Sequence, residues 1–192
     1  MSPPISSERD RSSERDRSSE RDRSAERDGL AALNDLPRAE LVERLLACLD
    51  VPRWADDVAD RRPFADLAEL LGAADGAAPD LTSGELDGAL AAHPRIGQRP
   101  AGTGTAADHA RGEQSGVDPD DAELSRALRE GNEEYERRFG HVYLVRAAGR
   151  SGAELLSILR SRLDNDPAAE RRVVERELRE IARLRLEKVI AG

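Results

Sequence analysis

Short stretches of periodic apolar residues, separated by glycine and proline, constrain the fold of this chain most strongly. From Leu30 onward, leucine, valine and alanine recur every three or four positions, which is the spacing of one face of an α-helix. In the stretch LPRAELVERLLACLD, Pro37 falls in the first turn, where its missing N–H is harmless. Aromatic residues make up only 3% of the 192 residues, and helix-forming residues dominate. A chain of this length is usually one domain, so we expect a compact single-domain all-α bundle of about eight helices with short connectors.

Residues 6–28 differ from the rest of the chain, because they repeat the unit SSERDR nearly four times. The repeat contains no large apolar residue, so it has no hydrophobic face to bury and is expected to be solvated. We therefore predict a low-complexity charged tail at residues 1–29, disordered apart from transient helix supported by Glu–Arg pairs. The helical domain is predicted at residues 30–192. An arm that binds a protein or RNA partner is the alternative interpretation of the tail.

Charge, cysteine content and hydropathy exclude several classes of protein. The net charge of −9 argues against a general nucleic-acid binder, whose binding face would be basic. Cys48 is the only cysteine, which excludes an intramolecular disulfide and a cysteine-based metal cluster. No apolar run is long enough to span a membrane and no apolar signal segment begins the chain, so we expect a soluble cytoplasmic protein without membrane or nucleic-acid partners. Histidine spacing fits no metal site and AGTGTA at residues 101–106 fits no phosphate loop, so we predict neither a metal nor a cofactor.

His93 stands directly before Pro94, after a stretch in which Thr82 and Glu85 have the spacing of a helix capping box. Proline disfavours helical geometry in the residue before it, so this helix should end at or just before His93. The helix macrodipole favours a protonated imidazole at that position, and such a group can donate a proton. A surface histidine at a helix end is the simpler interpretation, but the glycines that follow leave room for a ligand.

Two arginines are further candidates. Arg185 falls on the apolar face of the last predicted helix, which is formed by Val174, Leu178, Ile181 and Val189. A guanidinium among apolar side chains needs an acidic partner or an anionic ligand, unless its long side chain reaches the rim. Arg162 likewise falls among the apolar residues of a predicted helix, but it lies closer to the end of that helix.

Two other segments have simple alternative explanations. Glu113 and Gln114 lie in a short predicted helix, HARGEQSG, which is poor in large apolar residues, so a solvated face would by itself explain them. The run HVYLV at residues 141–145 favours a β-strand but is too short and isolated to build a sheet.

Taken in order, six stretches resemble the decarboxylases of 2-oxo-4-hydroxy-4-carboxy-5-ureidoimidazoline (OHCU), enzymes of urate degradation. They are LNDLPRAEL, RWADDVADRRPF, LTSGELDGALAAHPRIG, RGEQSG, GNEEYERRFGHVYLV and RLDNDPAAERRVVERELREIARLRLEKV. The resemblance covers about residues 30–190 and is carried mainly by His-Pro followed about twenty residues later by Glu-Gln. It implies an all-helical, cofactor-free carboxy-lyase that converts OHCU to (S)-allantoin and CO2. It also raises the question of a homodimer, for which periodicity identifies no interface.

The resemblance implies that His93 and Glu113 are catalytic, with His93 as the general acid–base. The remaining implied residues all contact the substrate, and they are Pro94, Gln114, Val142, Tyr143, Leu144, Val145, Arg185 and Arg162. Arg185 is the preferred match for the family arginine and Arg162 the second. The family commonly has a serine where this chain has Ala110, which removes one candidate hydrogen bond to the substrate.

Alternative functions stay open at this point. A non-catalytic helical module that binds a partner through its charged tail would need no small-molecule pocket. A second alternative is a divergent family member with altered substrate or lost activity, and Ala110 is the residue that supports this interpretation. A nucleic-acid regulator is disfavoured by the charge and by the lack of a convincing recognition helix.

Overall fold

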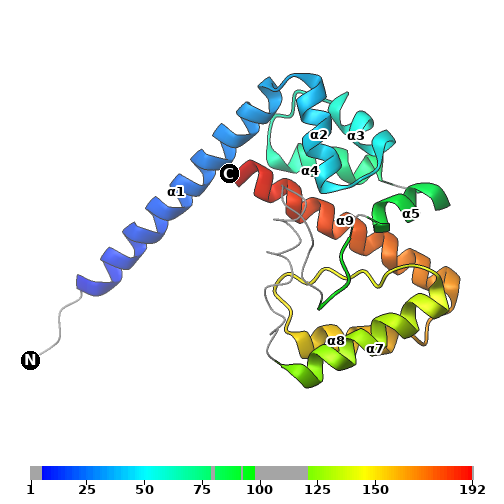
Figure 1. Ribbon diagram of the computed structural model, residues 1–192. Helices are drawn as coiled ribbons and strands as arrows, with labels where there is room; N and C mark the ends of the chain where they lie inside the picture. Colours follow the sequence, from blue (N-terminus) through cyan, green and yellow to red (C-terminus); the bar gives the residue numbers. More distant parts are fainter. Residues whose placement is uncertain (1–5, 79–80, 92, 98–120, 192) are drawn as a thin grey trace, which may run out of the picture.

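The computed structural model describes residues 6–78, 81–91, 93–97 and 121–191, and these form eight helices and no strand (Figure 1). The helices are α1 (Ser6–Asp35), α2 (Arg38–Cys48), α3 (Pro52–Ala59), α4 (Leu67–Ala77), α5 (Ser83–Ala91), α7 (Ala122–Phe139), α8 (Gly152–Arg162) and α9 (Pro167–Ala191). This arrangement confirms the all-α class predicted from the apolar periodicity. Within these ranges no helix combines the length and the apolar character needed to cross a membrane.

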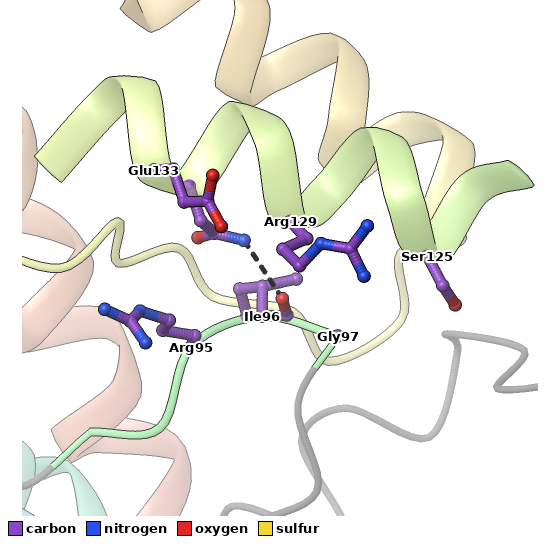
Figure 2. Close-up of a pocket in the computed structure, with 7 residues that line it drawn as sticks. Arg95, Ile96, Gly97, Ser125, Arg129 and Glu133 are labelled. Carbon is purple, nitrogen blue, oxygen red and sulfur yellow. Dashed lines mark hydrogen bonds between the residues drawn. The ribbon is translucent and has the colours of Figure 1, made fainter. Parts of the chain in front are cut away.

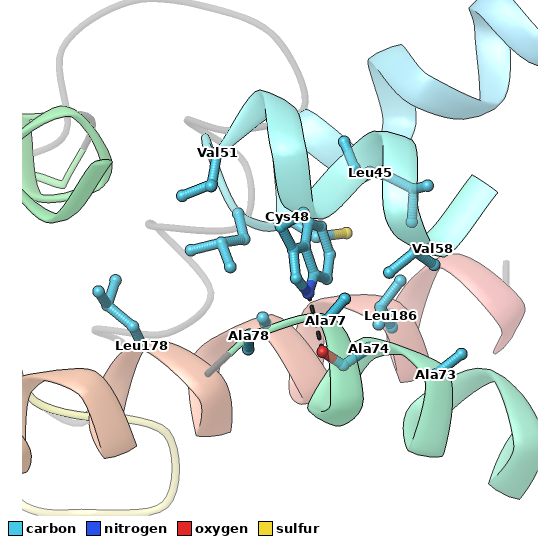
Figure 3. Close-up of a cluster of buried hydrophobic side chains, with 14 of the residues drawn as sticks. Leu45, Cys48, Val51, Val58, Ala73, Ala74, Ala77, Ala78, Leu178 and Leu186 are labelled. Carbon is cyan, nitrogen blue, oxygen red and sulfur yellow. Dashed lines mark hydrogen bonds between the residues drawn. The ribbon is translucent and has the colours of Figure 1, made fainter. Parts of the chain in front are cut away.

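Helix α9 is the axis of the larger hydrophobic core, which we call the α9 core. Helices α1, α2 and α4 pack against it, and α3 and α5 add buried side chains to the same cluster. The predicted stripe of Val174, Leu178 and Ile181 is buried, and Ile190 completes it while Val189 is half-buried. Figure 3 shows Leu178 and Leu186 of α9 facing Leu45, Cys48 and Val58 across this core.

Helices α7 and α8 lie side by side and enclose a second, smaller core, which we call the α7–α8 core (Figure 1). Its buried members come from both helices and from the two irregular segments beside them, and they are Ile96, Leu128, Tyr135, Tyr143, Val145, Ala147, Leu155 and Leu159. The fold therefore has two cores, and the segments that run between them are the natural place for a site.

Glycine ends one predicted helix and lies inside another. Gly140 follows α7 with φ +80°, and its N–H donates to the Glu136 carbonyl, as predicted for a glycine C-cap. Gly76, by contrast, is predicted to terminate its helix but lies inside α4, which continues to Ala77. The buried apolar residues Ala73, Ala74 and Ala77 hold that last turn on the core, so packing outweighs the weak helix propensity of one glycine. Asp118 and Pro119, the predicted start signals of α7, lie outside the described residues; Asp121 caps the helix.

Helix α1 includes the charged repeat, for which the sequence predicts helix supported by Glu–Arg pairs. The disorder of this tail stays a prediction. The described side chains between residues 20 and 28 are exposed or half-buried, as expected for a solvated segment, and burial begins at Leu30. Leu30 and Leu33 anchor the end of α1 in the α9 core, so the repeat extends an existing helix and needs no new nucleus. Opposite charges three residues apart, such as Glu20 and Arg23, support that extension.

Gly29 is the point at which α1 meets α9. A Cβ atom on Gly29 would clash with the carbonyl oxygen of Ile190, which is backbone and has little freedom to move. We expect Gly29→Ala to lower the free energy of unfolding by about 1–3 kcal/mol, because the two helices must separate to relieve the clash. Urea unfolding measures this change.

Gly72→Ala is the matched control, because it adds the same methyl group within α4, where a Cβ would meet nothing within 4 Å. The free energy of unfolding of this variant is expected to rise by about 0.5–1 kcal/mol, because alanine has a higher helix propensity than glycine. Equal effects of the two substitutions would contradict the close approach of α1 and α9.

Candidate active site

The His93–Gly97 segment leaves the end of α5. The predicted capping box starts that helix: the Thr82 N–H donates to Glu85 Oε2 at 2.8 Å, and the Glu85 N–H donates to Thr82 Oγ1 at 3.2 Å. The helix ends at Ala91, and the His93 N–H donates to the Leu90 carbonyl at 3.0 Å. The helix therefore ends just before His93, as the following proline predicts.

This segment passes from one core to the other. Leu90 is buried in the α9 core, and Ile96 is buried in the α7–α8 core. His93 and Pro94 lie between these two anchors and are half-buried. The backbone segment that carries His93 is therefore anchored in a packed core on both sides, which is the setting that a positioned acid–base group requires.

Residues 142–145 cross the same boundary in extended form. Their side chains alternate, as successive side chains do in an extended chain: Val142 and Leu144 pack on the α9 core, while Tyr143 and Val145 pack in the α7–α8 core. The run is not a strand, which agrees with the prediction that it is too short for a sheet. Ile96 shares its core with Tyr143 and Val145, so the structure brings this run and the His93–Gly97 segment together.

Arg162 lies beneath this extended run in a buried network. Its Nη1 donates to the Leu144 carbonyl at 2.6 Å, and its Nε donates to Glu170 Oε1 at 2.8 Å. Its Nη2 donates to Glu170 Oε1 at 2.5 Å and to the Tyr135 hydroxyl at 3.3 Å. The guanidinium carbon also lies 5.0 Å from the ring centroid of Tyr143. All three nitrogens thus donate to protein oxygens, and contact of Arg162 with the substrate stays a prediction.

Glu170 is the counter-charge of that network and has no exposed surface. Burial opposes its ionisation, but hydrogen bonds from Arg162, Tyr135 and Asn165 outweigh burial and hold the pKa of the carboxyl below its usual range. Burial, together with the hydrogen bond to Glu170, raises the pKa of Tyr135, so the phenol stays protonated and donates. The network is therefore an ionised pair supported by neutral donors.

Acid is expected to weaken the fold through Glu170. Because the folded state lowers the pKa of this carboxyl, its stabilisation is complete above the unfolded value of about 4.3 and is lost as the pH falls through the folded value. Urea unfolding of the wild type and of Glu170→Gln from about pH 7 to about pH 3 should show their difference in unfolding free energy shrinking with acid. A difference that stays constant over this range would contradict the assignment.

Arg185 lies on the buried face of α9, as its place on the apolar stripe predicts, and is 6% exposed. Its Nη1 donates to the Cys48 carbonyl at the end of α2, at 3.3 Å. The side chain therefore does not extend to the rim but stays within the α9 core. A guanidinium in such surroundings favours an anionic or carbonyl ligand.

Three sequence predictions lie outside the described residues: Glu113, Gln114 and the departure at Ala110. The described parts of the chain contain no group of three or more metal-ligating side chains.

The sequence reasoning missed the residues that hold the His93–Gly97 segment from the other side. A pocket of about 280 Å³ lies between this segment and α7, and Figure 2 shows its lining. The lining residues are Arg95, Ile96, Gly97, Ser125, Arg129, Asn132 and Glu133. Asn132 is buried, and a signal for it existed in the sequence, because it lies between Leu128 and Tyr135 on one helical face.

The chain matches the model of the OHCU decarboxylase family over residues 34–187. It is 30% identical over 161 residues to the OHCU decarboxylase of Amia calva, covering 82% of this chain and 92% of the relative. It is also 34% identical over 107 residues to the uric acid degradation bifunctional protein TTL of Arabidopsis thaliana, covering 54% of this chain and 33% of that protein.

Two solved structures share the fold. A crystal structure of OHCU decarboxylase in the presence of (S)-allantoin matches with a TM-score of 0.64 and 24% identity, covering 77% of this chain and 96% of the other. A crystal structure of (S)-allantoin synthase matches with a TM-score of 0.62 and 18% identity, covering 83% of this chain and 53% of the other. The match of the family model over most of the helical domain, together with the relative from Amia calva, shows that this chain belongs to the OHCU decarboxylase family.

Proposed function

We propose that this chain carries out the reaction of its family, the decarboxylation of OHCU in urate degradation, and that it yields (S)-allantoin through acid–base catalysis by His93. The observation that carries the proposal is the position of His93. It is half-buried, it lies directly after a helix C-terminus, and it belongs to a segment whose Ile96 packs with Tyr143 and Val145 of the irregular run. Such a setting holds an imidazole in place while leaving it able to exchange a proton.

The chemistry explains why a histidine is sufficient as the acid–base group. The substrate carries its carboxylate on C4, next to a C5=N bond. When the C4–CO2 bond breaks, its electron pair enters the imine, and CO2 departs. Protonation of the ring nitrogen, transfer of a proton to C5 and loss of the 4-hydroxyl proton then give the C4 carbonyl of allantoin, with one proton taken up overall. We propose that His93 delivers the proton on one face of C5, which sets the (S) configuration.

Because the imine itself accepts the electrons, we propose that the reaction needs no cofactor. The protein has to orient the substrate and supply a proton, and these are the two large rate terms available to it. Glu113 is proposed to hold the ureido or ring N–H groups, and Gln114 to hold the ring carbonyls. Pro94 is proposed to shape the substrate site beside His93.

The proposal separates the roles of the two arginines. Arg185, buried on α9, is proposed to pair with substrate oxygens. Arg162 is proposed to hold the extended run by its bond to the Leu144 carbonyl, so that backbone groups of residues 142–145 can contact the substrate. This division is supported by the protein acceptors that already engage Arg162.

Circular dichroism during urate breakdown tests the proposed function. Urate oxidase and hydroxyisourate hydrolase generate the substrate, and this protein is added last. Rapid appearance of the (S)-allantoin signal supports the proposal. Slow formation of racemic allantoin at the rate without the protein would overturn it and would favour the divergent family member, for which the Ala110→Ser variant is the next protein to assay.

A further inference from the structure

We propose that Asn132 and the Arg95–Glu136 ion pair are positioning residues, which fasten the His93–Gly97 segment to α7 and so place the His93 imidazole for proton transfer. The inference rests on the proposed function. It concerns one face of α7, on which Leu128, Asn132, Tyr135 and Glu136 follow one another at helical spacing. This face is turned toward the segment, as Figure 2 shows for the part around Ile96.

Asn132 is an unexpected residue at its position. Leu128 and Tyr135 on either side have no exposed surface, and Asn132 itself is 2% exposed, so an apolar residue would fit the pattern. Its Oδ1 atom is buried without a hydrogen-bond partner, which is unfavourable in a folded protein. Stability alone therefore gives no reason for the asparagine.

The hydrogen bonds made by the amide nitrogen of Asn132 give a reason for the asparagine. This nitrogen donates to the Ile96 carbonyl at 3.1 Å (Figure 2). It also donates to the Leu128 carbonyl at 2.7 Å. Ile96 is buried but lies in no helix, so regular secondary structure provides no partner for its backbone carbonyl. An apolar side chain at position 132 would leave that carbonyl without this donor and the segment without this attachment.

A second attachment lies one residue earlier. Arg95 Nε donates to Glu136 Oε1 at 2.5 Å, and Arg95 Nη2 donates to Glu136 Oε2 at 2.6 Å, which is a two-pronged ion pair. The two side chains are 43% and 22% exposed, and ion pairs in such surroundings contribute little to stability. The pair nevertheless restricts where the segment can lie relative to α7, because it joins residues that are 41 positions apart in the sequence.

These attachments bear directly on His93. On one side its own N–H is bonded to the end of α5, and on the other Arg95 and Ile96 are bonded to α7. Between these anchors lie His93 and Pro94, and proline fixes its own φ angle, so the stretch has little freedom. Without these bonds to α7, only the burial of Ile96 holds the segment on that side, and a displacement of about 1 Å lowers a rate by roughly a hundredfold.

The test begins with Asn132→Leu and Glu136→Gln in the full chain. Asn132→Leu is expected to lower kcat roughly ten- to a hundredfold with KM within about twofold. Its Tm should stay near that of the wild type, because loss of the Ile96 donor is offset by removal of the unpartnered oxygen. Glu136→Gln is expected to lower kcat by roughly threefold or more. Glu134→Gln, an exposed neighbour with the same charge change, should leave kcat unchanged.

A second comparison separates positioning from a purely structural role. Because Asn132 is proposed to act through His93, adding Asn132→Leu to His93→Ala should cause no further loss of rate. Wild-type kcat in Asn132→Leu, or the same loss of rate with and without His93, would overturn the positioning role. The proposed function fails separately, when the wild type forms allantoin no faster than the reaction without protein. His93→Ala with normal turnover overturns the acid–base role of His93, whereas inactive His93→Ala beside unimpaired Asn132→Leu overturns only the positioning.

Discussion

Replacing His93 with alanine is expected to lower kcat for (S)-allantoin formation by roughly 10²- to 10⁴-fold, the usual contribution of a positioned acid–base group. The physical reason is that C5 then receives its proton from water, with neither the orientation nor the stereochemical control that the fixed imidazole provides. The same loss is expected for His93→Gln, which keeps a polar side chain but has no group that titrates near neutral pH. The appearance of (S)-allantoin, followed by circular dichroism with excess supplying enzymes, measures both variants.

Both variants should remain folded, because His93 is half-buried rather than part of a core, and the bond from its backbone N–H to the Leu90 carbonyl survives substitution. Thermal unfolding within about 3 °C of the wild type would show this. Turnover within about threefold of the wild type in His93→Ala would contradict the acid–base role. Racemic rather than (S)-allantoin at a normal rate of CO2 release would instead separate bond cleavage from protonation.

Removing the cation of the buried network is the second large expected effect. Arg162→Met leaves Glu170, which has no exposed surface, without its counter-charge and leaves the Leu144 carbonyl without a donor. We expect a loss of about 3–5 kcal/mol in the free energy of unfolding, because an uncompensated buried charge is strongly unfavourable. Urea unfolding near neutral pH measures the change.

Two further proteins make this result specific. The double variant Arg162→Met/Glu170→Leu should lose less unfolding free energy than the two single variants lose in sum, because the second change removes the unpaired charge. Arg44→Met, which breaks an exposed pair with Glu40 on α2, should change stability by less than about 0.5 kcal/mol. If Arg162→Met cost less than about 1 kcal/mol, the network would not be a structural element of the fold.

Local chemistry explains which features were predictable from the sequence. Apolar spacing predicts the helices because a helix repeats every 3.6 residues, whatever its neighbours are. The end of α5 at Ala91 was predictable because Pro94 acts on the residue directly before it. The burial of Arg185 follows from its register on α9 for the same reason. The end of α4 was not predictable from Gly76, since burial of the final turn depends on a core that lies elsewhere in the sequence.

The sequence by itself determined the helical class, the family motifs and the candidates His93 and Arg185, since each depends on neighbours within a few residues. Tertiary structure alone decided which side chains meet across the two cores. Asn132 bonds to Ile96 and Glu136 to Arg95 over 36 and 41 residues, and Arg162 pairs with Glu170 across the turn between α8 and α9. Periodicity gives the direction of a side chain around its own helix, but a partner depends on how two elements are placed relative to one another. That placement arises from packing of the whole chain, which no local pattern encodes.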